Sequence, residues 1–280
     1  CITRSYKEYQ KRSKKADKMI LLQSEEASKV DRGGIPYALD RQEGDLTLPD
    51  ITRAAINFLT KKQGGKDGFF LMVEGGKIDW LCHANDVAFI PELIEMDDAV
   101  KVAYEFYQQH PDETLILVTA DHETGGLVLG RGGYQLNLQA VANQRMSISK
   151  LGTELHKLHD KYGDKYDWEV AKAFLTDNFG FWDKVQLSDD QTARLQRSFQ
   201  RVLEGKGVDA KSLYQKDSEF AGTVNRVMSE CARITWGTGG HSNGYVPCFS
   251  IGVGAEQLQG RLDNTELPVR IAKAAGWQVR

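Results

Sequence analysis

The stretch GFFLMVEGGKIDWLCHAND covers residues 68–86. Its first six residues form a continuous apolar run next to turn residues, which is typical of a strand buried on both faces of a parallel sheet. Four side chains that can bind a metal follow directly: Glu74, Asp79, Cys82 and His83. On a helix that begins near Asp79, the side chains of Asp79 and His83 point to the same face. The stretch therefore predicts a metal site at the end of a strand, with a solvated turn of ordinary charges as the alternative.

The residues around this stretch indicate the fold class. TLILVTA at 114–120 is a second buried strand, and residues 79–110 between the two have a helical apolar pattern in which Pro91 marks a break or a second helix start. Thr47 is placed to cap an earlier helix, with Asp50 three residues later. Strand, helix and strand make a βαβ unit, so the sequence predicts an α/β fold with a mostly parallel central sheet flanked by helices.

The predicted secondary structure changes in character twice along the chain. Charged helical patterns dominate after the second strand, and strand character returns with VPCFSIGVG at 246–254 before a terminal helix that starts near Asn264. We therefore expect a core segment at 1–138, a helical insertion at 139–233 and a return to the core at 234–280.

Composition excludes several classes of protein. The chain of 280 residues is 41% hydrophobic and 27% charged with a net charge of −3, which is ordinary for a globular protein and gives no electrostatic case for a nucleic-acid partner. No apolar run approaches the ~20 residues of a membrane span. The four cysteines form no C-x-x-C pair, which disfavours a zinc finger, and we interpret them as unpaired thiols although pairing stays open.

Two further clusters contain potential metal ligands. Asp121 and His122 in VTADHETGG follow the second strand, as Glu74 follows the first, and ligands of α/β proteins bind at the carboxyl ends of strands. His241 stands in the glycine-rich loop GTGGHSNG. Turn or cap roles are the alternatives for each. Taken together, carboxylates and imidazoles without thiolates are typical of catalytic zinc, and the Glu74 oxygens suit magnesium. Such a set suits two-metal displacement at phosphorus.

These three blocks, in this order, resemble the alkaline phosphatases. VEGGKIDWLCHAND is similar to the family's VEGG-x-ID-x-x-x-H block, VTADHETGG to its TADH block, and TGGHSNGYVPCFSIGVGAEQLQG to its GGH block. The resemblance implies an alkaline phosphatase-like fold with Zn²⁺ and Mg²⁺ as cofactors. It assigns the first zinc to Asp79, His83 and His241, the second zinc to Asp121 and His122, magnesium to Glu74, and a position near the phosphate to Trp80. A packed indole is the alternative for Trp80.

The resemblance implies hydrolysis of phosphate monoesters through a phosphoserine intermediate, in a periplasmic or secreted protein that can form a homodimer. The family carries its nucleophile in a D-S-A-type motif upstream of the VEGG block, and this chain has no such segment before Glu74. We therefore expect a C-terminal part of such an enzyme, without a catalytic nucleophile and inactive alone. Another hydrolase of the superfamily (a phosphodiesterase, sulfatase or phosphoglycerate mutase type) and a non-catalytic metal-binding module are the alternatives.

Overall fold

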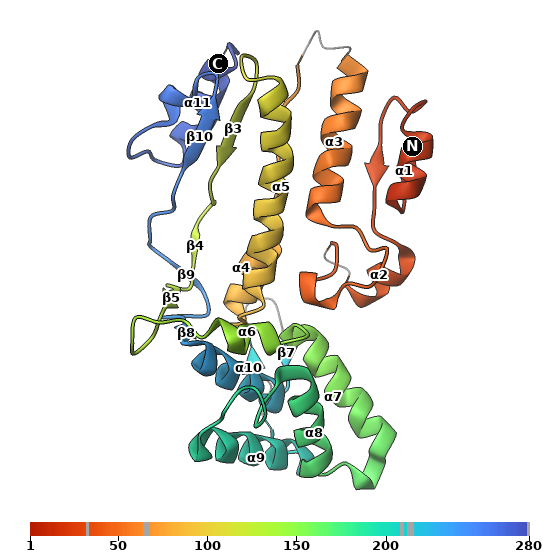
Figure 1. Ribbon diagram of the computed structural model, residues 1–280, viewed down its shortest axis with the longest axis vertical. Helices are drawn as coiled ribbons and strands as arrows, with labels where there is room; N and C mark the ends of the chain where they lie inside the picture. The colour runs from red at the N-terminus through yellow and green to blue at the C-terminus, as the bar shows by residue number, and fades with distance from the viewer. Residues whose placement is uncertain (32–33, 64–67, 208–209, 212–215, 279–280) are drawn as a thin grey trace.

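The computed structural model describes residues 1–31, 34–63, 68–207, 210–211 and 216–278. Helices make up most of this part of the chain (Figure 1). The molecule is elongated, with both termini and the long helices at one end and a group of shorter helices at the other.

The long helices α3 (Leu48–Gln63) and α5 (Phe89–Gln109) pack side by side (Figure 1). The cap expected for α3 is confirmed: the Asp50 N–H donates to Thr47 Oγ1 at 3.2 Å, and the Thr47 N–H donates to Asp50 Oδ2 at 3.4 Å. This reciprocal pairing satisfies two of the donors that a helix start leaves free. Shorter helices α1 (Tyr6–Arg12) and α2 (Glu25–Val30) lie beside α3.

The helical pattern predicted for residues 79–110 forms two helices. The first is α4 (Lys77–His83), and the second is α5, which begins at Phe89. Pro91 lies in the first turn of α5, where a missing N–H removes no helical hydrogen bond, so it marks the second helix start as expected.

The strands form short pairs. The longest pair joins β3 (Leu115–Val118) to β10 (Phe249–Gly252) in antiparallel register, with Val118 opposite Phe249. Three more antiparallel pairs join β4 (Glu123–Thr124) to β9 (His241–Ser242), β5 (Val128–Leu129) to β8 (Ile234–Thr235), and β6 (Ala210–Lys211) to β7 (Lys216–Asp217). The strands β1 (Ile2–Thr3) and β2 (Ile20–Leu21) pair in parallel.

The mostly parallel central sheet is not seen in the part of the chain that the structure describes. Residues 68–73, predicted to be a strand buried on both faces, form no assigned strand. Their side chains alternate between half-buried and exposed, and Phe70 and Met72 are 61% and 67% exposed. The ring of Phe69 contacts Phe106 on α5, while β3 pairs with β10. On the other face the Phe70 ring contacts the Trp277 ring edge to face, with centroids 6.3 Å apart, so this face is only partly covered.

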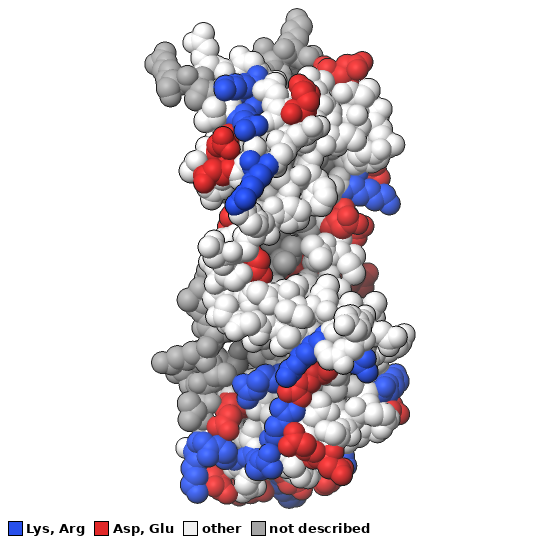
Figure 2. Space-filling model, turned by 90° about the vertical axis from the view of Figure 1, so that its left-hand side faces the viewer, with Lys and Arg blue, Asp and Glu red and all other residues white. Residues whose placement is uncertain are grey.

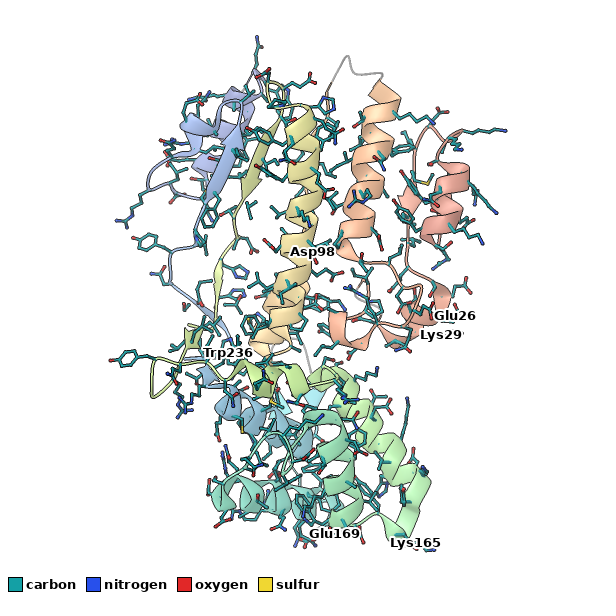
Figure 3. The ribbon with its side chains drawn as sticks, in the orientation of Figure 1. Glu26, Lys29, Asp98, Lys165, Glu169 and Trp236 are labelled. Atoms are coloured by element: carbon teal, nitrogen blue, oxygen red, sulfur yellow. The ribbon has the colours of Figure 1, made fainter. Side chains whose placement is uncertain are left out.

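Residues 139–233 are largely helical, and the interpretation of this segment as an insertion stays a prediction. The helices are α6 (Leu138–Asn143), α7 (Ile148–Tyr162), α8 (Trp168–Phe179), α9 (Asp189–Leu203) and α10 (Glu219–Ala232), with the β6–β7 pair between the last two. They gather at the lower end of Figure 1, next to α4. One hydrophobic cluster continues from these helices into α4 and the start of α5, so the insertion shares its core with the rest of the chain. Within it, the rings of Trp236 (Figure 3) and Phe89 meet edge to face at 5.8 Å.

Charged side chains are distributed unevenly along the molecule. Figure 2 shows basic and acidic side chains interspersed over the insertion at the lower end, whereas the middle of this face has few charges. None of the helices in the described ranges is long and apolar enough to cross a membrane. All four cysteines are free thiols, as we interpreted them. The terminal helix α11 (Glu266–Ala274) begins after Thr265, close to the expected position.

Candidate metal centre

Helix α4 supplies two of the expected ligands from one face. Leu81 and Cys82 are almost fully buried and anchor the helix in the core. Asp79 and His83 lie one turn apart, and Asp79 Oδ1 is 3.3 Å from His83 Nε2. His83 is buried, whereas Asp79 is partly open to solvent. The spacing in the sequence therefore produces the predicted pair.

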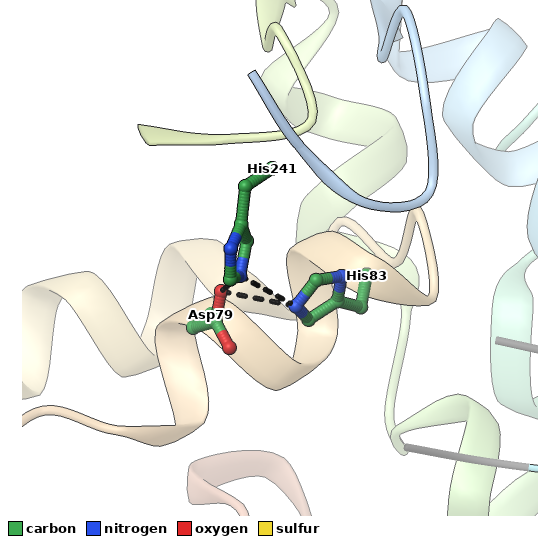
Figure 4. Close-up of side chains that lie close together, drawn as sticks. All are labelled: Asp79, His83 and His241. Atoms are coloured by element: carbon green, nitrogen blue, oxygen red, sulfur yellow. Dashed lines mark hydrogen bonds and ion pairs between the residues drawn. The ribbon is translucent and has the colours of Figure 1, made fainter. Parts of the chain in front are cut away.

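Strand β9 brings the third ligand to this pair. In the β4–β9 ladder, His241 stands opposite Thr124. Its Nε2 atom lies 3.2 Å from His83 Nε2 and 3.5 Å from Asp79 Oδ1 (Figure 4). Among the residues that the structure describes, these three form the only group of three or more His, Cys, Asp or Glu whose ligand atoms lie within 4.8 Å of one another. Residues that are 158 positions apart thus lie together, as the resemblance to the family implies.

The geometry of the three atoms fits zinc. They form a triangle with sides of 3.2, 3.3 and 3.5 Å. Four ligands at about 2.0–2.1 Å in a tetrahedron lie about 3.3 Å from one another, so the triangle matches one tetrahedral face. Two imidazoles and one carboxylate leave a fourth position for water or substrate, which is the composition of a catalytic rather than a structural site.

The tautomer of His83 also suits metal binding through its Nε2 atom. Its Nδ1 lies 2.7 Å from the carbonyl oxygen of Gly239, which can only accept a hydrogen bond. The hydrogen therefore sits on Nδ1, and in the neutral ring the Nε2 lone pair faces Asp79 and His241. A backbone carbonyl that fixes the second nitrogen in this way is typical of metal-binding histidines.

Two polar residues after the predicted Asp-His pair stabilise the site, Thr124 by a bond to a ligand and Glu123 by bonds to the neighbouring loop, and sequence reasoning gave them no role beyond shaping the turn. Thr124 Oγ1 donates to Asp79 Oδ1 at 2.6 Å. The Glu123 carboxylate accepts the Ser242 hydroxyl and the Gly126 N–H. Partial burial raises the pKa of Glu123, but these hydrogen bonds outweigh it and the net pKa is lowered. The position of the two polar residues directly after Asp121 and His122 was the one feature of the sequence that could have indicated this role.

A glycine contact fixes the loop that carries His241. Gly125 has φ +79°, and a Cβ there would lie 2.7 Å from the Thr238 carbonyl oxygen. Its own carbonyl accepts the N–H groups of Gly237 and Thr238 at 2.8 and 3.0 Å. The backbone at Gly125 therefore approaches the loop that carries His241 closely, which requires a residue without a side chain at position 125.

Asp121 and His122 lie beside this centre without joining it. The His122 ring stacks on His241 with centroids 3.6 Å apart, whereas the Asp121 side chain is 86% exposed. Within the described residues, His122 Nδ1 is buried without a hydrogen-bond partner. The second zinc site stays a prediction, with one of its two residues in contact with the first site.

The remaining candidates lie apart from the three-ligand group. Glu74 is exposed, with its carboxylate beside Gly76, and the magnesium role stays a prediction. Trp80 is half-buried against the core, with the Lys77 Nζ atom 5.5 Å from the centroid of its ring, so a packed indole describes it and its proximity to phosphate is untested. Burial raises the pKa of the Cys82 thiol to about 12, and Cys82 is not part of the three-ligand group.

Comparisons with known proteins point to one family. A profile described as alkaline phosphatase matches residues 9–277. Alkaline phosphatase 3 of Bacillus subtilis is 30% identical over 249 residues, which are 89% of this chain and 48% of that protein. The repressible alkaline phosphatase of Saccharomyces cerevisiae is 28% identical over 254 residues, which are 83% of this chain and 42% of that protein. The chain thus spans about half the length of these curated relatives.

A solved structure shares the fold. The cold-active alkaline phosphatase of a psychrophilic Shewanella sp. superposes with a TM-score of 0.74 at 23% identity, over 98% of this chain and 58% of that one. The fold is therefore alkaline phosphatase-like, although the described part shows only small sheets. Since the family profile covers almost the whole sequence, the chain belongs to the alkaline phosphatase family.

Proposed function

We propose that the protein hydrolyses phosphate monoesters and that Asp79, His83 and His241 hold a zinc ion at its active site. The observation that carries the proposal is the triangle of ligand atoms, whose sides of 3.2–3.5 Å fit one face of a zinc tetrahedron. Bound zinc would polarise a phosphoryl oxygen and lower the pKa of a coordinated water. The chain's own part is to hold three ligands and leave the fourth position open.

The other metal roles extend this centre. Asp121 and His122 would bind a second zinc, for which the stacking of His122 on His241 gives support, and Glu74 would bind magnesium. A solved variant of the Antarctic TAB5 alkaline phosphatase, 22% identical with a TM-score of 0.53, is described as having Mg bound. Trp80 would lie near the substrate.

The nucleophile is proposed to come from outside residues 1–280. The support is the sequence itself, which has no D-S-A-type segment ahead of Glu74. We accordingly propose that these residues alone do not hydrolyse phosphate esters. A periplasmic or secreted location and a homodimer are part of the same proposal by resemblance to the family.

Zinc titration tests the metal centre. The dissociation constant is measured in competition with a chromophoric chelator for the unaltered chain, His241→Ala and His156→Ala. His156 is the matched control, since it is exposed like His241 but lies on α7, outside the three-ligand group. Tight binding that His241→Ala abolishes and His156→Ala leaves unchanged supports the centre. Equal binding by all three proteins contradicts it.

Hydrolysis of 4-nitrophenyl phosphate tests the reaction. The chain alone, with zinc and magnesium, is expected to give no turnover above buffer, and chelator-sensitive turnover would refute the external nucleophile. The same chain is then joined to the part of the Bacillus subtilis relative that lies outside the matched residues. Turnover that requires His241 is expected, whereas a joined protein that binds zinc without hydrolysing the ester argues against the proposed reaction.

A further inference from the structure

The turn that follows His83 is short and conformationally defined. Helix α4 ends at His83 in a pair of hydrogen bonds, from the Asn85 N–H to the Cys82 carbonyl and from the Asp86 N–H to the Leu81 carbonyl, both at 2.9 Å. Asn85 adopts φ +53°, the left-handed conformation that closes helices in this way. These bonds leave the carbonyls of residues 84 and 85 and the Asp86 carboxylate to find partners elsewhere.

Helix α10 of the insertion satisfies both carbonyls. Asn225 Nδ2 donates to the Ala84 carbonyl at 2.8 Å and to the Asn85 carbonyl at 3.1 Å. Ser229 Oγ lies 2.8 Å from the Asn85 carbonyl and 3.0 Å from the Asn225 carbonyl of its own helix, so its one hydrogen has both oxygens as acceptors, with the turn as the nearer. Asn225 and Ser229 are 3% and 6% exposed, so no bulk water competes for these carbonyls. Two residues one helical turn apart thus hold the end of the metal-binding helix.

The start of α7 holds the Asp86 carboxylate. Its Oδ2 accepts the Ile148 N–H at 2.8 Å, at the first residue of α7, and its Oδ1 accepts Gln144 Nε2 at 2.7 Å. The Ala88 N–H, which lies outside the helical segment 139–233, also donates to Asp86 Oδ1, at 2.9 Å. The turn after His83 is therefore fastened by α10, by Gln144 and by the N-terminus of α7.

We propose that the helical insertion positions the zinc ligand His83, with Asn225 and Ser229 as the positioning residues. The inference rests on the proposed metal centre. Helix α4 has only seven residues, too few to be stable alone, so tertiary contacts set its position. On the opposite side the Gly239 carbonyl fixes the imidazole, and α10 fixes the backbone that carries it. A shift at α10 moves the end of α4, and with it His83, relative to His241 on β9.

The test compares two buried serines of the insertion. Ser229→Ala removes the hydroxyl that bonds both the Asn85 carbonyl and the Asn225 carbonyl of its own helix. Ser198→Ala removes a hydroxyl that, in the part of the chain that the structure describes, donates within α9 to the Leu195 carbonyl at 3.0 Å. Ser198 is 4% exposed, so the two changes match in burial and chemistry. Ser229→Thr retains a hydroxyl. Asn225→Asp keeps the side-chain shape and sets a carboxylate oxygen against two carbonyl oxygens.

The zinc dissociation constant and the visible spectrum of the Co²⁺-loaded chain are the readouts. One lost hydrogen bond corresponds to a factor of about five, so Ser229→Ala is expected to weaken zinc binding by about fivefold and Asn225→Asp by about tenfold or more. Both are expected to change the Co²⁺ spectrum, and Ser229→Thr restores affinity to within about twofold. Ser198→Ala changes neither readout, although thermal unfolding of the metal-free chain shows similar destabilisation in the two alanine variants.

Three outcomes overturn the inference. Affinities within twofold of the unaltered chain for Ser229→Ala and Asn225→Asp would show that α10 does not position His83. Equal weakening by Ser198→Ala and Ser229→Ala would show general destabilisation. Absence of zinc binding by the unaltered chain would overturn the proposed metal centre and this inference with it, whereas the first two outcomes leave that centre intact.

Discussion

Replacement of Thr124 by valine isolates one hydrogen bond at the candidate metal centre. Valine has nearly the shape of threonine but lacks the hydroxyl that donates to Asp79 Oδ1 at 2.6 Å. The acceptor is a carboxylate, and a hydrogen bond to a charged group contributes about 1.5–3 kcal/mol. At about 1.4 kcal/mol per factor of ten, zinc affinity should fall about 10- to 100-fold, the range typical when a partner of a metal ligand is removed.

The assay is zinc titration against a chromophoric chelator at pH 7. Thr124→Ser, which keeps the hydroxyl, should retain affinity to within about fivefold. Thr176→Val is the matched control, since this half-buried threonine donates to the Lys172 carbonyl within α8, far from the ligands in the sequence. If Thr124→Val binds zinc as tightly as the unaltered chain, the hydroxyl does not hold Asp79 in its metal-binding orientation. If Thr176→Val weakens binding equally, the loss comes from reduced stability.

Three further predictions concern other parts of the structure. Gly125→Ala places a Cβ at φ +79° against the Thr238 carbonyl, so it should lower the free energy of unfolding by about 1–3 kcal/mol and weaken zinc binding, as measured by urea denaturation and zinc titration. Burial raises the pKa of Asp86 to about 6 from 3.8, so the folded state binds the proton more tightly and stability falls as the pH rises from about 4 to 6. Relative to Asp86→Asn, the free energy of unfolding of the metal-free chain should fall by on the order of 3 kcal/mol over that window. A pH-independent difference between the two proteins would contradict this assignment. Leu175→Ala, at a fully buried position of α8, should cost about 2–5 kcal/mol in urea denaturation, whereas a cost below 1 kcal/mol would mean that the insertion is loosely packed.

The sequence predicted those features of the site that depend on local spacing. Asp79 and His83 are four residues apart, and a helix converts that spacing into a shared face whatever surrounds it. The cap at Thr47 and the second helix start at Pro91 are local in the same sense. The helical character of the insertion follows from apolar periodicity, which is also a short-range property.

Features that depend on pairing between distant segments were less predictable. The apolar run shows that residues 68–73 favour an extended conformation, but it does not show with which strand they would pair. The structure leaves Phe70 and Met72 largely exposed. The antiparallel pairing of β3 with β10 could not be read from either strand alone. The contacts of Asn225 and Ser229 with the turn after His83 join residues about 140 positions apart and have no local signature.

The β4–β9 pair shows how one long-range contact carries several parts of the centre. Its register sets Thr124 opposite His241, while the Thr124 hydroxyl donates to Asp79 on α4. The pairing that delivers the third ligand therefore also orients the first one. A change that disrupts this ladder displaces His241 and also removes the hydrogen bond to Asp79. The effects on zinc affinity of substitutions at His241 and Thr124 should therefore not be additive. The affinity of the site is thus a property of the strand pairing as much as of the three ligands.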